Sequence, residues 1–142
     1  MFEVWVNDGA RWIDLYPVAE DVLEHAPYPS GMDALRLAEL SQRSFYGEYV
    51  AVGNFPAEIE ASYGQILVTR TITWARWIHK ENSMRKVAFD QWEVHGSDCA
   101  CEKMKARIGT IIRTKDIERV PLNDCWKDCH CWYGVHRPNR KR

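Results

Sequence analysis

The first 98 residues of this chain contain no cysteine, and no part of the chain is a long hydrophobic run. No apolar stretch approaches about 18 residues, so the sequence predicts no transmembrane helix and no membrane partner. The N-terminus, MFEVWVNDGARW, lacks a basic segment followed by an apolar one, so we expect no signal peptide and no secretion. A glycine-rich phosphate loop and a Gly-x-Ser-x-Gly elbow are also missing, which argues against two common enzyme classes.

Neither sign of charge is in large excess. The formal net charge is -1 over 142 residues, which does not by itself suggest a nucleic-acid partner. The distribution is uneven, however, because residues 1–62 are acidic and four cations lie in the last six residues: Arg137, Arg140, Lys141 and Arg142. This basic tail could contact nucleic acid or an acidic partner, and a solvated terminus is the simpler interpretation.

The cysteines that are present gather in one stretch, which three histidines flank or interrupt. They are Cys99, Cys101, Cys125, Cys129 and Cys131, together with His95, His130 and His136. An odd number of cysteines without a secretory signal indicates a reducing compartment, where clustered cysteines bind metals more often than they form disulfides. Thiolates are soft ligands that suit Zn²⁺, and four of them close a structural site that has no open position for catalysis.

We therefore predict one structural Zn²⁺ that two Cys-x-Cys pairs bind. The preferred ligands are Cys99, Cys101, Cys129 and Cys131. Cys125 is the first replacement for one of them and His95 the next, and His130 and His136 remain further candidates. Trp126 and Trp132 flank the second pair and are expected to pack over the metal and exclude water. The alternative is that the cysteines are small buried residues or form incidental disulfides.

Hydrophobic periodicity predicts an α+β fold. Strands at about 2–6 and 11–15 flank the turn Asn7-Asp8-Gly9-Ala10, and helices follow at about 18–25, 32–46 and 56–63. Residues 64–82 fit both a strand and a helix pattern, and length favours a helix over 68–82. A strand at about 86–94 leads into the cysteines. We expect a single domain, 1–142, with a hairpin and helical part (1–65), a Cys-rich part (66–136) and a basic tail (137–142).

An ordered series of features in the second half supports a more specific interpretation. Arg70-Thr71 lies in the predicted helix and Trp92 in the predicted strand. The first cysteine pair comes next, followed by a glycine-led strand and a proline-containing loop. These two features are Gly109-Thr110-Ile111-Ile112 and the loop with Asp116-Ile117 and Pro121-Leu122, and the series closes with Cys129-His130-Cys131-Trp132-Tyr133.

In this order of features, residues 69–134 resemble the C-terminal part of the Mu F-like minor head protein family of tailed phages. The resemblance implies a virion-associated, non-enzymatic protein that helps to build the capsid or portal region and contacts other capsid or portal proteins. The implied location is the virion or the host cytoplasm. The first pair here is Cys-x-Cys where the family has Cys-x-x-Cys. The family's histidine falls on Trp126, so Cys125 is a candidate for the missing ligand.

Two rival interpretations remain open at this stage. The chain could be a small zinc-stabilised module that binds a host protein, or nucleic acid through its tail and tryptophans. It could also be an enzyme, because His79-Lys80-Glu81 echoes the His-x-Glu of zinc deaminases, and His95 with Asp98 beside a metal could support hydrolysis. The deaminase pattern also needs Pro-Cys-x-x-Cys, which is missing, so we favour a protein without catalytic activity.

Overall fold

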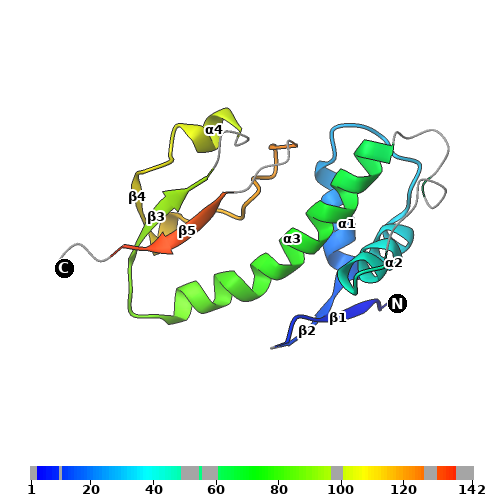
Figure 1. The fold of residues 1–142 in the computed structure, drawn as a ribbon, viewed down its shortest axis with the longest axis horizontal. Helices are drawn as coiled ribbons and strands as arrows, with labels where there is room; N and C mark the ends of the chain where they lie inside the picture. Colours follow the sequence, from blue (N-terminus) through cyan, green and yellow to red (C-terminus); the bar gives the residue numbers. More distant parts are fainter. Residues whose placement is uncertain are drawn as a thin grey trace. The chain divides into compact units, whose positions relative to one another are not determined.

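The structure is a computed structural model that describes residues 3–9, 11–48, 55, 61–96, 101–126 and 131–136. Within these ranges the fold is α+β, as the sequence predicted, with two small antiparallel sheets (Figure 1). The elements in chain order are β1 (Trp5–Asn7), β2 (Trp12–Asp14), α1 (Leu15–His25), α2 (Ala34–Phe45), α3 (Ala61–Lys86), β3 (Gln91–His95), α4 (Glu102–Lys105), β4 (Ile111–Arg113), the 3-10 turn Thr114–Asp116 and β5 (Trp132–Val135).

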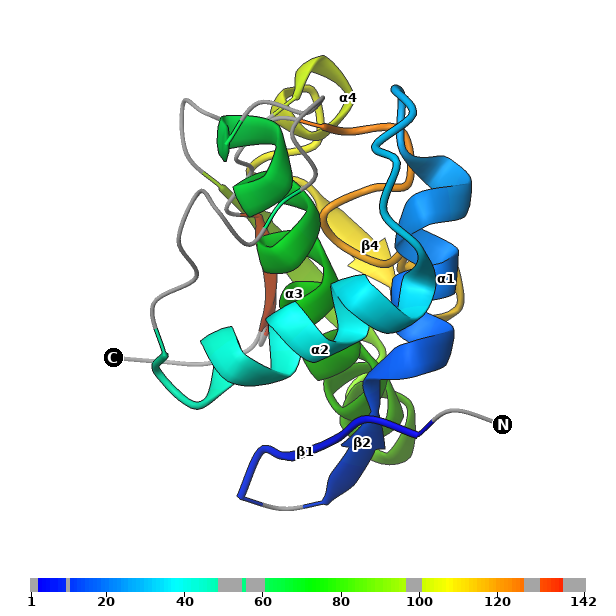
Figure 2. The ribbon, with the colours of Figure 1, turned by 90° about the vertical axis from the view of Figure 1, so that its right-hand side faces the viewer.

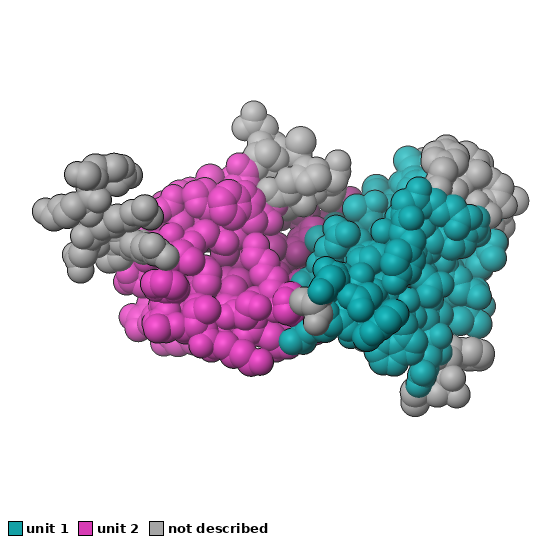
Figure 3. Space-filling view, turned by 60° about the horizontal axis from the view of Figure 1, so that its bottom comes forward, with its two compact units in different colours: residues 1–76 teal, residues 77–142 magenta. Residues whose placement is uncertain are grey.

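Contacts divide the chain into two compact units, Met1–Arg76 (unit 1) and Trp77–Arg142 (unit 2), which Figure 3 colours separately. The boundary lies inside α3, whereas the sequence placed the start of the Cys-rich part at residue 66. The helix is one continuous element, because its backbone pattern runs unbroken from residue 61 to residue 86. The division that tertiary contacts produce after Arg76 therefore differs from the start of the Cys-rich part at residue 66.

The N-terminal hairpin of unit 1 forms as the turn chemistry predicts. Val6 pairs with Ile13 in an antiparallel register, and both side chains are buried. In the turn, the Asn7 side chain accepts a bond from the N–H of Gly9 at 2.8 Å, and Asp8 accepts one from Arg11 at 3.0 Å. Gly9 has a φ of 96°, a left-handed conformation that glycine adopts without strain. Side-chain bonding and glycine together fix the turn.

Aspartate side chains mark the starts of the next two helices. Asp14 accepts a bond from the N–H of Tyr16 at 3.1 Å and caps α1, and Asp33 accepts one from Arg36 at 2.8 Å and caps α2. These bonds satisfy backbone donors that a helix leaves unpaired in its first turn. The two helices pack on one another (Figure 2). The helices predicted at 18–25 and 32–46 are thus confirmed, with starts at Leu15 and Ala34.

The ambiguous stretch after residue 64 is a helix, and α3 is longer than the prediction at both ends. Its threonines would favour a strand, but two of their hydroxyls donate to carbonyls four residues earlier. Thr71 bonds Leu67 at 2.8 Å and Thr73 bonds Thr69 at 2.9 Å. Residues 61–63 of the expected helix at 56–63 belong to α3, and its other residues lie outside the described ranges.

Unit 2 contains a three-stranded sheet in the order β4-β3-β5. The predicted strand over 86–94 forms only over Gln91–His95, with the expected alternation of buried Trp92 and Val94. Gly109, at a φ of 85°, donates to the carbonyl of Val94 at 2.9 Å and turns the chain into β4. The glycine-led strand is therefore present, at Ile111–Arg113.

Candidate metal centre

The inner face of this sheet carries the core of unit 2. Trp92, Val94 and Tyr133 alternate with outward-facing neighbours, and each is at most 5% exposed. Side chains from α3, α4 and the loop after β4 complete one hydrophobic cluster, whose members are Trp77, Met84, Trp92, Val94, Met104, Ile117, Val120, Leu122, Cys125 and Tyr133. Burial of this apolar surface holds the short elements of unit 2 together.

Three of the five cysteines meet this one cluster. Cys125 is a member and is 3% exposed, and Cys101 and Cys131 are partly buried and pack against it. All three carry thiols that are not in disulfides. They come from three separate segments: Cys101 precedes α4, Cys125 lies in the loop after β4, and Cys131 precedes β5. Three segments that are far apart along the chain therefore each place a thiol against the same hydrophobic cluster.

The register of β3 and β5 brings Cys131 to the end of β3. His95 pairs with Trp132, so Gly96 lies opposite Cys131 when the register is continued by one residue. A Cβ atom on Gly96 would lie 3.0 Å from the Sγ of Cys131, which shows how closely this thiol approaches the backbone at the end of β3. Cys99 follows Gly96 by three residues, a span of at most roughly 11 Å.

Polar contacts link the segments that carry these cysteines. The Tyr133 hydroxyl donates to the Glu118 carbonyl at 2.9 Å and accepts from the Glu118 N–H at 3.3 Å. The Glu118 carboxylate accepts from Arg107 at 2.7 Å and lies 3.6 Å from the Nζ of Lys103. Burial raises the pKa of Tyr133 above its usual 10.0, so the hydroxyl remains a neutral donor. These bonds tie β5 and the α4 region to the loop that leads to Cys125.

Cysteine thiolates are suitable ligands for zinc, but the described residues show only part of the proposed site. Among the described residues, no group of three or more His, Cys, Asp or Glu side chains is close enough together to hold a metal ion. Cys99, Cys129 and His130, which include half of the preferred tetrad, lie outside the described ranges. The zinc ion and the choice of its ligands therefore stay a prediction.

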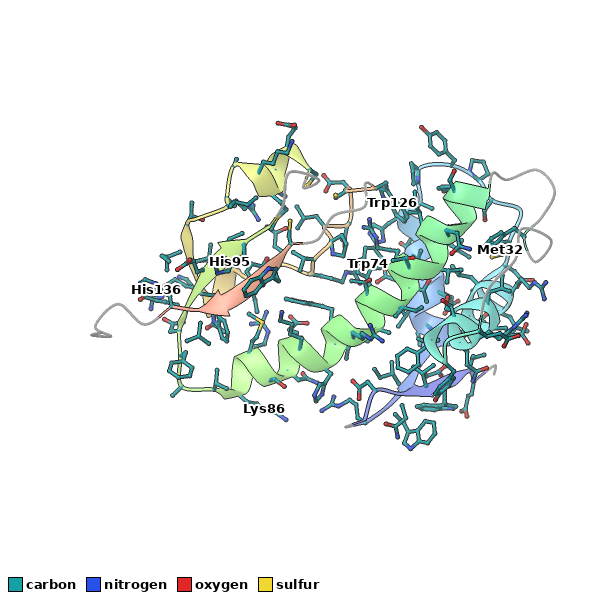
Figure 4. All side chains as sticks on the ribbon, viewed as in Figure 1. Met32, Trp74, Lys86, His95, Trp126 and His136 are labelled. Carbon is teal, nitrogen blue, oxygen red and sulfur yellow. The ribbon has the colours of Figure 1, made fainter. Side chains whose placement is uncertain are left out.

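His95 and His136 lie on the other face of the sheet from Cys125. His95 Nε2 lies 3.5 Å from Oε1 of Glu93, and His136 Nδ1 lies 3.7 Å from Oε2 of the same carboxylate. Figure 4 labels both histidines on the ribbon. Glu93 is not among the residues predicted for the site, although its alternation with Trp92 and Val94 indicates the face of His95. Strand alternation thus separates these histidines from the thiols at the core.

The two tryptophans beside the second cysteine pair differ in their surroundings. Trp132 is 49% exposed and stacks on His95, with ring centroids 4.1 Å apart. Its ring therefore lies on the face of the sheet opposite to the core that contains Cys125, because neighbouring strand residues point to opposite faces. Trp126 is half-buried, and its Nε1 donates to the carbonyl of Asn123 at 3.0 Å.

The residues that suggested an enzyme include a pair on α3, His79 and Glu81. The Glu81 carboxylate accepts two bonds from Arg85, at 3.0 and 3.2 Å. An i,i+4 ion pair of this kind is usual on a solvated helix face. Asp98, the proposed partner of His95 in hydrolysis, lies outside the described residues.

Acid is expected to weaken unit 2 through Glu118. Hydrogen bonding from Arg107 holds the pKa of Glu118 below its usual 4.5. A folded-state pKa below the unfolded one adds stability above pH 4.5, and that stability is lost as the pH falls through the lower, folded value. Because the side chain is 44% exposed, we expect a contribution below about 1 kcal/mol.

Urea unfolding of the Glu118→Gln variant between pH 6 and pH 3 should show a flatter dependence on pH than the unmodified protein. Glu102→Gln is the matched control. The Glu102 side chain is 86% exposed, and its ion pair with Lys105 is long, at 3.9 Å. Protonation of metal-binding thiolates at low pH would destabilise all three proteins equally, so it cancels when their pH dependences are compared. Equal slopes for Glu118→Gln and the unmodified protein would refute the stabilising role of this carboxylate.

Comparisons with known proteins supply no relative: no family model, curated protein or solved structure matches the chain. The helices that the structure describes include none long and apolar enough to span a membrane. The arrangement of unit 2 therefore supplies the main structural support for a functional proposal.

Proposed function

We propose that this protein is a non-enzymatic structural and assembly protein of a tailed phage, a minor head or portal-neck component in which one structural Zn²⁺ holds unit 2 together. The observation that supports the zinc site is the approach of Cys131 Sγ to Gly96 at the end of β3, in a unit where Cys101 and Cys125 also pack in the same hydrophobic cluster. The proposed ligands are the sulfur atoms of Cys99, Cys101, Cys129 and Cys131, with Cys125 as the replacement for one of them.

A closed thiolate site is a structural device. Zinc with four protein ligands leaves no position for water or substrate, so it stabilises a fold without activating a nucleophile. Short elements such as α4 and β4 gain most from such a ligand cluster, because they bury little surface of their own.

The order of elements from α3 to β5 supports the assignment to phage heads. A helix that contains Arg70-Thr71 is followed by a strand with Trp92, the first cysteines and the strand that Gly109 introduces. A loop with Pro121 and Leu122 then leads to β5. This is the order that the resemblance to Mu F-like minor head proteins implies. One difference is that Arg70-Thr71 lies within α3, where the family pattern has it open the helix.

Fractionation of phage particles tests this role. Particles from a culture that produces the chain should be purified on a density gradient and analysed by mass spectrometry. The chain is expected to co-sediment with heads at a few copies per particle, and elemental analysis of the purified protein should give about one zinc per chain. An unrelated soluble protein of similar mass is the control. Recovery of the chain only at the top of the gradient would refute the head assignment and leave the zinc site to be judged by metal content.

A further inference from the structure

The strand β5 lies at an edge of the sheet of unit 2, because the strand order is β4-β3-β5. The N–H of His136 donates to the carbonyl of Gln91 at 3.1 Å, so these two residues form a hydrogen-bonded pair between β5 and β3. Such pairs alternate along an antiparallel ladder, so the N–H and C=O groups of Tyr133 and Val135 point away from β3. Among the described residues, no backbone hydrogen bond from outside the sheet reaches either of them.

Edge strands are usually protected against pairing with other chains by a charged side chain, a proline or a bulge. The other edge strand, β4, carries Arg113 and runs directly into the 3-10 turn Thr114–Asp116, which ends it. The sequence of β5 is Trp-Tyr-Gly-Val, which contains neither a charged residue nor a proline. The open edge of β5 is therefore free of the features that prevent a further strand from pairing with it.

Apolar side chains are exposed on both faces beside this edge. Trp132 is 49% exposed, and Val135, on the opposite face, is 41% exposed. A Cβ atom on Gly134 would lie 3.1 Å from Cζ3 of Trp132, so the indole ring lies over Gly134. A strand that paired along the edge would cover part of both exposed side chains, which favours association through burial of apolar surface.

A second copy of β5 fits this edge when a two-fold axis passes through Gly134. Antiparallel pairing in this register places Tyr133 of each copy opposite Val135 of the other. These are the residues whose backbone groups point outward, so each of the two pairs can exchange both N–H···O bonds. The interface uses the same surface on both copies, as a closed dimer requires.

The side chains also fit this register. The two copies of Gly134 would face each other at the axis, in a pair whose Cα atoms are about 4.5 Å apart. Because each Trp132 ring lies over its own Gly134, the two rings would meet above the glycines and cover each other's exposed surface. On the opposite face, Val135 would be covered by Tyr133 of the second copy.

We propose that unit 2 self-associates through β5, with two copies of the chain pairing antiparallel about Gly134 into one sheet of order β4-β3-β5-β5-β3-β4. The strand is uncharged and the chain has a net charge of -1, so repulsion between copies is small. Because the strand is short, the interface is smaller than a standard one, and we expect a dissociation constant on the order of 100 μM. This association goes beyond the proposed role in particle assembly and does not depend on it.

Sedimentation velocity of the full-length protein from about 10 μM to 1 mM tests the association. Val135→Lys should raise the dissociation constant about ten-fold or more, because the charge enters the interface twice. Ile111→Lys is the matched control, since Ile111 is 40% exposed on the other edge strand, and this variant should dimerise like the unmodified protein. Both side chains are partly exposed at an edge, so ¹⁵N spectra of the two variants should show unit 2 still folded.

Amide hydrogen exchange identifies the edge that pairs. At about 1 mM, the amides of Tyr133 and Val135 should exchange about five-fold more slowly than in dilute solution, because about a fifth of the chains stay monomeric at ten times the dissociation constant. The amides of Ile111 and Arg113 point away from β3 on the open side of β4, and their exchange should not depend on concentration.

Four results would overturn the proposal. The first is sedimentation as a monomer at about 1 mM. The second is a dimer that Val135→Lys leaves as stable as before. The third is slowed exchange at Ile111 and Arg113 with none at Tyr133 and Val135, which would assign the interface to β4. The fourth is slow exchange of Tyr133 and Val135 at every concentration, which would mean that the chain itself already covers the edge.

Discussion

A strong zinc chelator is expected to unfold unit 2 and to leave unit 1 folded. Metal binding to thiolates in small sites contributes roughly 10–16 kcal/mol of apparent free energy, comparable to or greater than the net stability of a typical domain. The seven tryptophans report on the two units separately, because Trp5, Trp12 and Trp74 belong to unit 1 and the other four to unit 2. In a ¹⁵N correlation spectrum, the four indole signals of unit 2 should collapse and the three of unit 1 should persist.

Added zinc should restore the four signals, and other divalent ions of harder character, such as Mg²⁺, should not. Cys131→Ser should bind less than one zinc per chain and show the collapsed spectrum without a chelator, because Cys131 is the thiol that approaches the end of β3. If all seven indole signals are unchanged in excess chelator, the metal has no structural role. The hydrophobic cluster alone would then hold unit 2 together.

Replacing Trp74 by alanine is expected to destabilise unit 1 by about 3–5 kcal/mol. Trp74 is 1% exposed and is the largest fully buried side chain among the residues that the structure describes. Its ring lies 5.5 Å from the Arg70 guanidinium carbon and meets the His25 ring edge-on at 5.9 Å. Alanine would leave a cavity. It would also remove the cation–π contact of the Arg70 guanidinium, which is itself only 3% exposed. Urea unfolding monitored at the Trp5 indole measures the change.

Trp12→Ala is the control for this experiment, because the Trp12 side chain is 62% exposed on the outer side of the hairpin. Its effect on the free energy of unfolding should stay within about 0.5 kcal/mol. Comparable losses for the two variants would contradict the burial that the structure assigns to Trp74. They would mean that the hairpin, rather than α3, carries the stability of unit 1.

Local features of the chain were predictable where local chemistry decides them. The Asp-Gly turn, the amphipathic helices α1 and α2, and the alternation of Trp92 and Val94 each follow from turn residues or from hydrophobic period. Local chemistry did not decide the structure of the stretch after residue 64, because its residues fit both a strand pattern and a helix pattern. There the burial of Leu67, Thr71 and Trp74 along one helical stripe outweighs the β-propensity of the threonines.

The sequence by itself determined an α+β chain whose cysteines crowd into its last third, since composition and spacing are local facts. Only the tertiary structure decided which side chains share a surface. Strand register placed Gly96 opposite Cys131, set Trp132 on His95 and turned both His95 and His136 away from the core. The physical reason is that burial of apolar side chains from distant segments selects which strands pair and in which register. The register then determines the face on which each strand residue lies.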